Sequence, residues 1–127
     1  MTRPAGFLSD DLRRQIVEHC LAELPNEGCG LIAVADGHAV RVYPTSNADA
    51  SPSSYTIPPQ EHFAALVDAE SRGWEMGGVY HSHPYGPAEM SVTDLARAME
   101  PHWVYVVVGL ADRDRPVVEI ATIGEKT

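Results

Sequence analysis

The chain has 127 residues, with 9 lysines and arginines against 18 aspartates and glutamates, a formal net charge of −9 and 44% hydrophobic residues. This length predicts one domain over residues 1–127, built around a single core. The excess of acids argues against a protein that binds nucleic acid, because phosphate binding needs clustered lysine and arginine. The apolar run from Val104 to Val108 is too short to span a membrane.

Two cysteines, Cys20 and Cys29, are too few for a disulfide scaffold, and they form no Cys-x-x-Cys pair. The first residues hold no apolar run of the signal-peptide type. We therefore expect a cytoplasmic protein in which both thiols stay free. Each cysteine is expected to be a small buried side chain.

The spacing of apolar and turn residues predicts helices alternating with strands. In chain order the expected elements are a helix over residues 10–24, strands over 29–35 and 39–43, a loop over 44–59 with a short strand at 55–57, a helix over 59–73, a strand over 74–83, a loop over 84–90, a helix over 91–99, and strands over 103–110 and 117–123. Ser9 is expected to cap the first helix, Asp36-Gly37 to turn the first hairpin, and Gly77-Gly78 to mark a bulge or a close backbone approach. This order predicts an α/β fold of the α+β type, with a central, mostly antiparallel sheet flanked by helices.

Two histidines stand two residues apart at the end of the third long strand. Because side chains alternate along a strand, His81 and His83 project from one face, about 7 Å apart at their backbones. That spacing suits two imidazoles that bind one metal ion. A His-x-His pair alone is equally compatible with ordinary core or surface histidines.

Asp94 follows His83 in the first turn of the next predicted helix. A turn and helix of this length can bring its carboxylate back over the strand end, which completes the three-ligand set of a catalytic zinc site. Ser91 and Asp94 also match the Ser/Thr-x-x-Asp/Glu capping box, so helix capping is an alternative role for both residues.

Glu27 stands between the end of the first helix and the start of the first strand, in the segment Pro25-Asn26-Glu27-Gly28-Cys29-Gly30. A metal-activated water needs a proton acceptor that is not itself a ligand. Glu27 could supply it, because its small neighbours allow a carboxylate to approach closely. The alternative is a solvated glutamate in a surface loop.

Together these residues resemble the signature of the JAMM (MPN-plus) metalloproteases: Glu27, then His81-x-His83, seven residues, and Ser91-x-x-Asp94, matched without a gap. The resemblance covers nearly the whole chain and implies a cytidine-deaminase-like/MPN fold. It also implies one zinc ion (Zn2+) per chain, bound by His81, His83 and Asp94 with water as the fourth ligand. In such a site Glu27 would move protons between the water and the leaving amine, and Ser91 would donate a hydrogen bond to the oxyanion.

The segment Asn47-Ala48-x-x-Ser51-Pro52-x-x-Tyr55-x-Ile57-x-Pro59 is similar to one in the bacterial branch of that family. This resemblance implies a peptidase that cleaves after the C-terminal Gly-Gly of a small ubiquitin-like sulfur-carrier protein, for example to release cysteine from a carrier–cysteine adduct. Given the acidic balance of the chain, we expect such a carrier to present basic residues around its tail.

Other functions stay open. A deubiquitinase-like isopeptidase would use the same residues, and a non-catalytic module could bind a ubiquitin-like partner around a structural metal. Two histidines and one carboxylate also form the facial triad of non-haem iron enzymes, although no anchor for a cosubstrate is evident. A zinc nucleoside deaminase is disfavoured, because its Pro-Cys-x-x-Cys signature is absent.

The other aromatic and imidazole side chains carry weaker signals, and we state an expectation for four of them. His19, His38 and His62 have no ligand partner at a suitable spacing, and we expect them at the surface. Tyr55 is expected either to line a groove for the carrier tail or to pack in the core.

Overall fold

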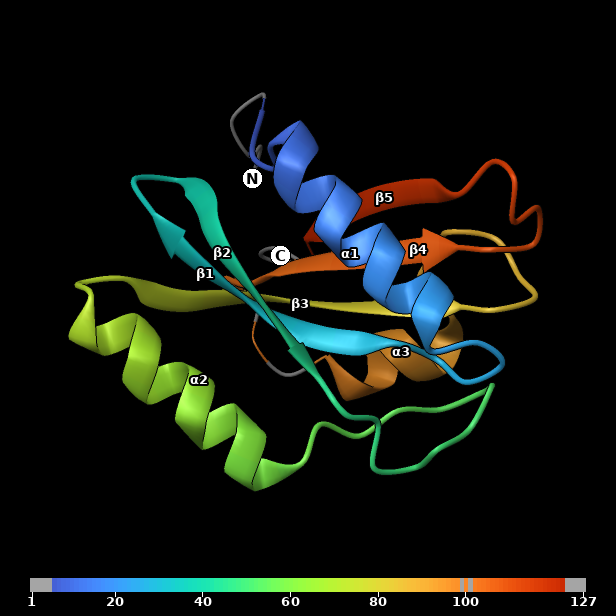
Figure 1. Ribbon diagram of the computed structural model, residues 1–127, viewed down its shortest axis with the longest axis horizontal. Helices are drawn as coiled ribbons and strands as arrows, with labels where there is room; N and C mark the ends of the chain where they lie inside the picture. The colour runs from blue at the N-terminus through green and yellow to red at the C-terminus, as the bar shows by residue number, and fades with distance from the viewer. Residues whose placement is uncertain (1–5, 99, 101, 123–127) are drawn as a thin grey trace.

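The computed structural model describes residues 6–98, 100 and 102–122. Its elements are α1 (Asp10–Ala22), β1 (Cys29–Ala35), β2 (His38–Thr45), α2 (Pro59–Ser71), β3 (Glu75–His83), α3 (Val92–Arg97), β4 (Val104–Gly109) and β5 (Val117–Thr122). The five strands form one sheet in the order β2-β1-β3-β4-β5, seen across Figure 1. Only the β3–β4 pair is parallel among the four strand pairs of the described residues. The structure thus confirms the predicted mixed fold and its mostly antiparallel sheet.

The local signals that were read from the sequence act as expected. Ser9 caps α1, because its hydroxyl accepts a hydrogen bond of 3.2 Å from the backbone N–H of Leu12. Asp36 and Gly37 both take positive φ angles, of 53° and 79°, as a two-residue type I′ hairpin turn requires. Gly77 is the extra residue of a bulge, since Ile32 pairs with Gly78 and the next residue of β1 pairs with Met76.

The expected bounds of several elements are wrong. The second helix ends at Ser71 and not at 73, and the second strand runs over His38–Thr45 and not 39–43. The first helix ends at Ala22, two residues early, because the N–H of Leu24 bonds back only three residues, to Leu21, and Pro25 has no N–H with which to continue the helix. No strand forms over residues 55–57, because the backbone of Thr56 bonds within its own loop, to Asn47 and Ala48.

The third helix is shorter than the expected 91–99. Ser91 is its cap and Ala98 is already extended. Met99 and Ile123, the last residues of two expected elements, lie outside the described residues.

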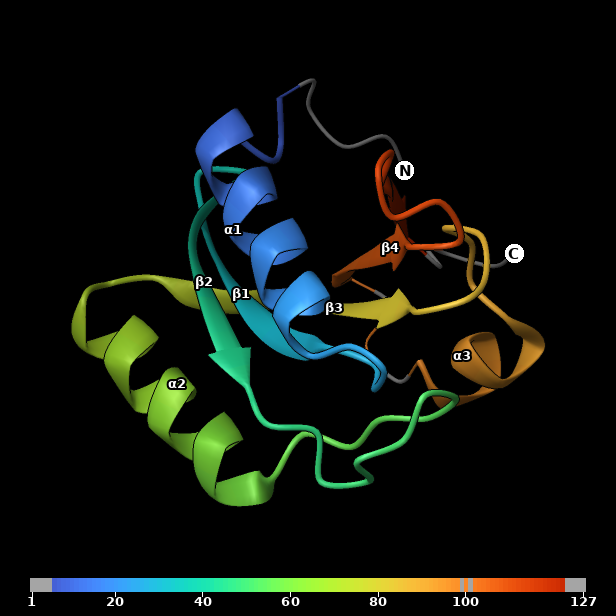
Figure 2. The ribbon, with the colours of Figure 1, turned by 45° about the vertical axis from the view of Figure 1, so that its right-hand side comes forward.

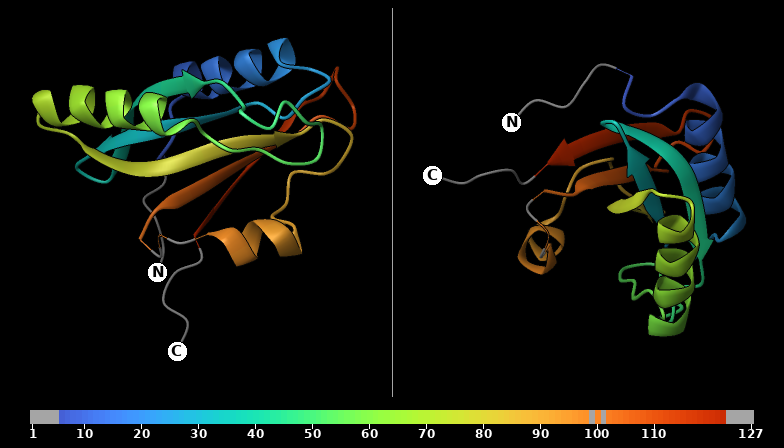
Figure 3. Two further views of the ribbon diagram at one scale, coloured as in Figure 1. Left: turned by 90° about the horizontal axis from the view of Figure 1, so that it is seen from below. Right: turned by 90° about the vertical axis from the view of Figure 1, so that its left-hand side faces the viewer.

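Figure 3 shows the twisted sheet with α1 and α3 on opposite sides of it. The sheet separates two apolar layers. On one face, Ile16 and Cys20 of α1 pack against the inward side chains of the strands, among them Ile32, Tyr80 and Val106. On the other face, α2 contributes Ala65 and Ala69, which pack with Leu31, Val79 and Tyr105. Successive residues of each strand serve opposite layers, which is the alternation that a sheet covered on both faces requires.

The end of β3 is where the site is built. Cys29 at the start of β1 pairs with His81 near the end of β3, so the segment before β1 lies beside both histidines. The loop over residues 46–58 and helix α3 converge on the same place, as Figure 2 shows. No helix in the described part of the chain is both long and apolar enough to cross a membrane.

Candidate metal and catalytic site

Three side chains meet at the end of β3: His81, His83 and Asp94. Nε2 of His81 lies 3.2 Å from Nε2 of His83 and 3.1 Å from Oδ2 of Asp94. Nε2 of His83 lies 3.0 Å from the same carboxylate oxygen. β3 supplies the two imidazoles on one face, and α3 returns the carboxylate over them, as the spacing predicted.

This donor set fits a tetrahedral ion. Bonds of about 2.0–2.2 Å in tetrahedral geometry place neighbouring ligand atoms about 3.3–3.5 Å apart. The three contacts observed, 3.0–3.2 Å, are close to that separation. The ligand atoms of these three residues all lie within 4.8 Å of one another, close enough to bind one metal ion.

His83 has a defined tautomer. Its Nδ1 lies 2.9 Å from the carbonyl oxygen of Pro87, and a carbonyl can only accept, so Nδ1 carries the proton. Nε2 is then the nitrogen that offers a lone pair to a metal. Without a metal, the hydrogen bond to Asp94 raises the pKa of His83 against the opposing effect of burial.

Asp94 both caps the start of α3 and faces the two histidines. Its N–H donates to Oγ of Ser91 at 3.0 Å, and its Oδ2 accepts from the N–H of Ser91 at 2.9 Å, which completes the capping box. The same Oδ2 faces the two histidines. Burial alone would raise its pKa, but hydrogen bonds with His81 and His83 outweigh burial and hold the pKa of Asp94 below its usual range.

Glu27 is buried, so the alternative expectation of a solvated glutamate in a surface loop is wrong. Its exposed fraction is 5%, and Oε1 is buried without a hydrogen-bond partner in the described part of the chain. Burial raises its pKa to about 7, while the nearby charges of His83 and Arg97 act in the opposite direction. An unpaired buried carboxylate costs stability, so a fold that retains one points to a function for it.

The backbone around Glu27 is fixed on two sides. Its N–H donates to the carbonyl of Ser51, and its own carbonyl accepts from Nδ2 of Asn47. Gly28 donates to Oγ of Ser82, between the two histidines, at 2.8 Å. Gly28 has no side chain to separate it from α1, where a Cβ would lie only 2.9 Å from Cα of Cys20. Gly28 thus lets α1 pack closely.

Tyr55 stacks on one of the candidate ligands. Its ring centroid lies 4.7 Å from that of His81, with the planes 20° apart. From the sequence, Tyr55 is expected in a groove or in the core, and its contact with a histidine is not predicted. A contact between a loop and a strand produces no regular spacing in the sequence. Likewise Ser82 was missed as a partner of Gly28, although it stands inside the His-Ser-His motif.

Two cavities flank the three candidate ligands. The inner cavity, of about 230 Å³, is mostly apolar and includes Leu31, Val79, His81, Met90, Arg97 and Tyr105 in its wall. The outer cavity, of about 520 Å³, includes Glu27, Ser53, His83, Tyr85, Ser91 and Arg97. Tyr55, Asp94 and Arg97 belong to both walls, so the cavities meet at the site.

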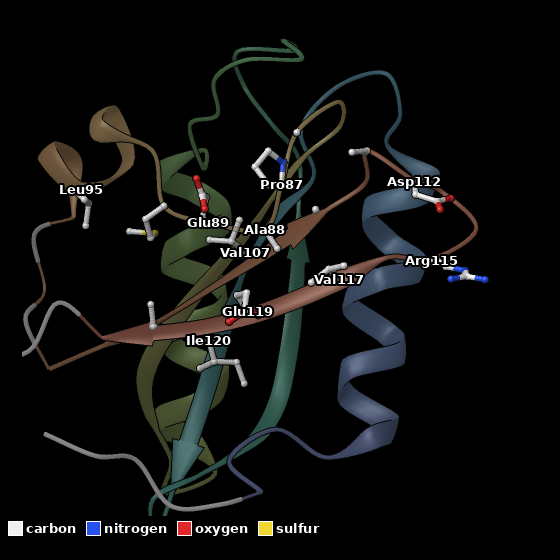
Figure 4. A pocket seen from close by; sticks show the side chains of 15 residues that line it. Pro87, Ala88, Glu89, Leu95, Val107, Asp112, Arg115, Val117, Glu119 and Ile120 are labelled. Atoms are coloured by element: carbon white, nitrogen blue, oxygen red, sulfur yellow. The ribbon is translucent and has the colours of Figure 1, made fainter.

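Another cavity, of about 650 Å³, lies between the loop over residues 86–90 and the strands β4 and β5 (Figure 4). Ala88, Val107 and Ile120 are among its wall residues. It contains none of the five candidate site residues.

His19 corrects a prediction. It was expected at the surface, but its side chain is 16% exposed and Nδ1 lies 2.6 Å from the hydroxyl of Tyr80. His38 and His62 are exposed, and both cysteines are buried and free, as expected.

Comparison with known proteins identifies relatives over most of the chain. Residues 9–121 match the family described as prokaryotic homologs of the JAB domain. The chain is 35% identical to a desampylase of Haloferax volcanii over 114 residues, which cover 84% of this chain and 82% of that one. It is 33% identical to a CysO-cysteine peptidase of Mycobacterium tuberculosis over 107 residues, 83% of this chain and 73% of the other.

Solved structures share the fold. A protein of Desulfitobacterium hafniense matches with a TM-score of 0.82 and 35% identity, over 91% of this chain and 82% of that one. A JAB1/MPN domain protein of Archaeoglobus fulgidus matches with a TM-score of 0.54 and 17% identity, over 91% and 88% of the two chains. The fold is that of a JAB1/MPN-type domain. The chain belongs to the prokaryotic JAB-domain family.

Proposed function

We propose that this chain is a zinc-dependent peptidase that hydrolyses the bond after the C-terminal Gly-Gly of a small ubiquitin-like carrier protein. The observation that carries the proposal is the buried carboxylate of Glu27, which has no partner of its own and shares the outer cavity with His83, Ser91 and Asp94. A structural metal site would gain nothing from such a carboxylate.

In this proposal His81, His83 and Asp94 hold one zinc ion per chain and leave a fourth position to water. When bound, zinc lowers the pKa of a water molecule and polarises a carbonyl oxygen. Two hydrogen bonds from the chain orient the ligands, one from His83 to Pro87 and one from Ser91 to Asp94. These bonds reduce the reorganisation that binding an ion requires.

Glu27 is the proton carrier. Burial keeps it out of bulk water, and it is free to accept a proton from the attacking water and to deliver it to the leaving nitrogen. Hydroxide from the water adds to the carbonyl carbon, the C–N bond then breaks, and the proton that Glu27 accepted goes to the leaving amine. Ser91 uses a lone pair to accept from the N–H of Asp94, so its hydroxyl hydrogen is available to the oxyanion.

The substrate class rests on the relatives. A desampylase and a CysO-cysteine peptidase, each at least 33% identical to this chain, are both named for small protein modifiers or carriers. We extend that class to this chain, including release of cysteine from a carrier–cysteine adduct. A reducing compartment such as the cytoplasm suits the two free, buried thiols.

The test uses the zinc-loaded protein and a ubiquitin-like carrier extended beyond its Gly-Gly by one cysteine. Intact-mass spectrometry should show loss of that residue and a carrier that ends in Gly-Gly. A second carrier, joined through its Gly-Gly to a lysine side chain, separates a peptidase from an isopeptidase. If neither carrier is cleaved while the protein binds them, the protein is a binding module.

A further inference from the structure

Arg97 is the only arginine or lysine among the described residues that line the two cavities. It ends α3, three residues after Asp94, so the two side chains leave the helix on the same side. Within the described residues no carboxylate lies within 4.0 Å of its guanidinium. Arg97 is close enough to lower the pKa of Glu27 by its charge.

Three acidic residues share a cavity wall with Arg97. Glu100, in the wall of the inner cavity, makes no ion pair with Arg97 within 4.0 Å. Asp94 belongs to the candidate metal site, and Glu27 is the proposed proton carrier. A bound substrate is therefore a natural source of the carboxylate that a guanidinium at this place would pair with.

The inner cavity is large enough to accommodate one amino-acid residue of a substrate. Its volume, about 230 Å³, is less than half the 520 Å³ of the outer cavity. That is room for a single amino acid and not for a folded partner. The outer cavity is larger and carries Glu27 and Ser91, so it suits the carrier tail.

We propose that Arg97 binds the free α-carboxylate of the residue that is released, and so makes the enzyme selective for carriers extended by a single C-terminal residue. This inference rests on the proposed function. In such a substrate the carboxylate carbon lies about 2.5 Å from the leaving nitrogen. A residue one helical turn from the ligand Asp94 is placed to reach it. In a lysine isopeptide the leaving nitrogen has only methylenes beside it, so Arg97 has no carboxylate to bind there.

The experiment compares two substrates that differ in one charge. One is a ubiquitin-like carrier that ends in Gly-Gly-Ala with a free carboxylate, and the other is the same carrier ending in alaninamide. Because the carrier is identical, a preference reports the α-carboxylate and not an acidic side chain of the carrier. The zinc-loaded protein should cleave the acid with a kcat/KM about tenfold above that of the amide, a factor equal to about 1.4 kcal/mol.

Arg97→Gln should reduce this ratio to about one, and Arg97→Lys should keep part of it, since an ammonium retains the charge without the bidentate geometry. Arg13→Gln, an exposed arginine on α1, is the matched control and should keep the full ratio. A Glu27→Gln background, in which both substrates should turn over about 10²–10⁴-fold more slowly, allows the same ratio to be measured as a ratio of Kd values.

Equal cleavage of acid and amide by the wild-type protein would refute the role of Arg97 and leave the proposed peptidase intact. So would an Arg97→Gln variant that slows both substrates by the same factor. Failure to cleave either substrate would refute the proposed function itself, and this inference with it.

Discussion

The ring of Tyr55 lies nearly parallel to that of His81, 4.7 Å away, so a loop residue covers one face of a candidate metal ligand. The imidazole of His81 is buried, and its rotation about the side-chain bonds is limited by this ring together with the contact of Nε2 with Oδ2 of Asp94, 3.1 Å away. The stack restricts that rotation before any ion binds, which lowers the cost of ordering the ligand.

Replacing Tyr55 should therefore weaken metal binding. We expect Tyr55→Leu to raise the Kd for zinc about three- to tenfold, the range that corresponds to a lost aromatic contact. Tyr55→Phe keeps the ring and should bind as the wild type does. Competition with a chromophoric chelator measures both values, and equal affinities for the two variants would show that the stack does not orient His81.

Metal content tests the three-ligand site. The purified protein should contain about one zinc ion per chain, and His83→Ala should abolish it, because two remaining ligands hold the ion poorly. His38→Ala, which removes an exposed histidine, is the control and should retain the metal. Elemental analysis by mass spectrometry gives the ratio. Iron in place of zinc, with turnover that depends on oxygen, would contradict the peptidase and favour the facial-triad alternative.

The buried carboxylate of Glu27 should destabilise the metal-free protein in a pH-dependent way. Below its ordinary pKa of 4.5, Glu27 is protonated in both the folded and unfolded states. Between 4.5 and about 7 the unfolded chain releases the proton and the folded chain does not, so stability falls as the pH rises and the loss is complete above about 7.

Glu27→Gln should accordingly raise the free energy of unfolding of the metal-free protein at pH 8 by a few kcal/mol, at about 1.4 kcal/mol per unit of pKa. The gain should fade toward pH 4.5. Urea unfolding after chelation measures both, with the exposed Glu18→Gln as the control for loss of a surface carboxylate. A variant that is less stable than the wild type at pH 8 would mean that Glu27 has a partner.

Asn47 should hold the site loop together. Its Nδ2 donates to the carbonyls of Glu27 and Ser54, and its Oδ1 accepts from the N–H groups of Asp49 and Thr56. Removing these four bonds by Asn47→Ala should cost about 1–3 kcal/mol of unfolding free energy, measured in denaturant. The comparison variant is Asn26→Ala, because no hydrogen bond involves that side chain in the described residues. Equal losses of unfolding free energy in the two variants would show that Asn47 does not hold the loop together.

The sequence predicted the fold well because its signals were local. A Ser cap, an Asp-Gly turn and alternating apolar residues act over a few neighbours, and each has the expected effect in the structure. The meeting of His81, His83 and Asp94 was also predictable, since a strand and the turn that follows it set their spacing.

Contacts between distant segments could not be predicted in the same way. The stack of Tyr55 on His81 joins a loop to a strand, and the bond from His19 to Tyr80 joins α1 to β3 across 61 positions. Neither leaves a periodic pattern. The burial of Glu27 likewise depends on the loop that covers it, so the sequence alone left a solvated glutamate as the alternative.

The proposed peptidase activity is tested most directly by the rate at which the Glu27→Gln variant cleaves a Gly-Gly carrier extended by one cysteine, measured at the same zinc occupancy as the wild type. We expect the variant to retain its zinc and its affinity for the carrier, while kcat/KM falls by about 10²–10⁴-fold through loss of the proton carrier. A zinc-loaded variant that cleaves the carrier at the wild-type rate would contradict the role of Glu27.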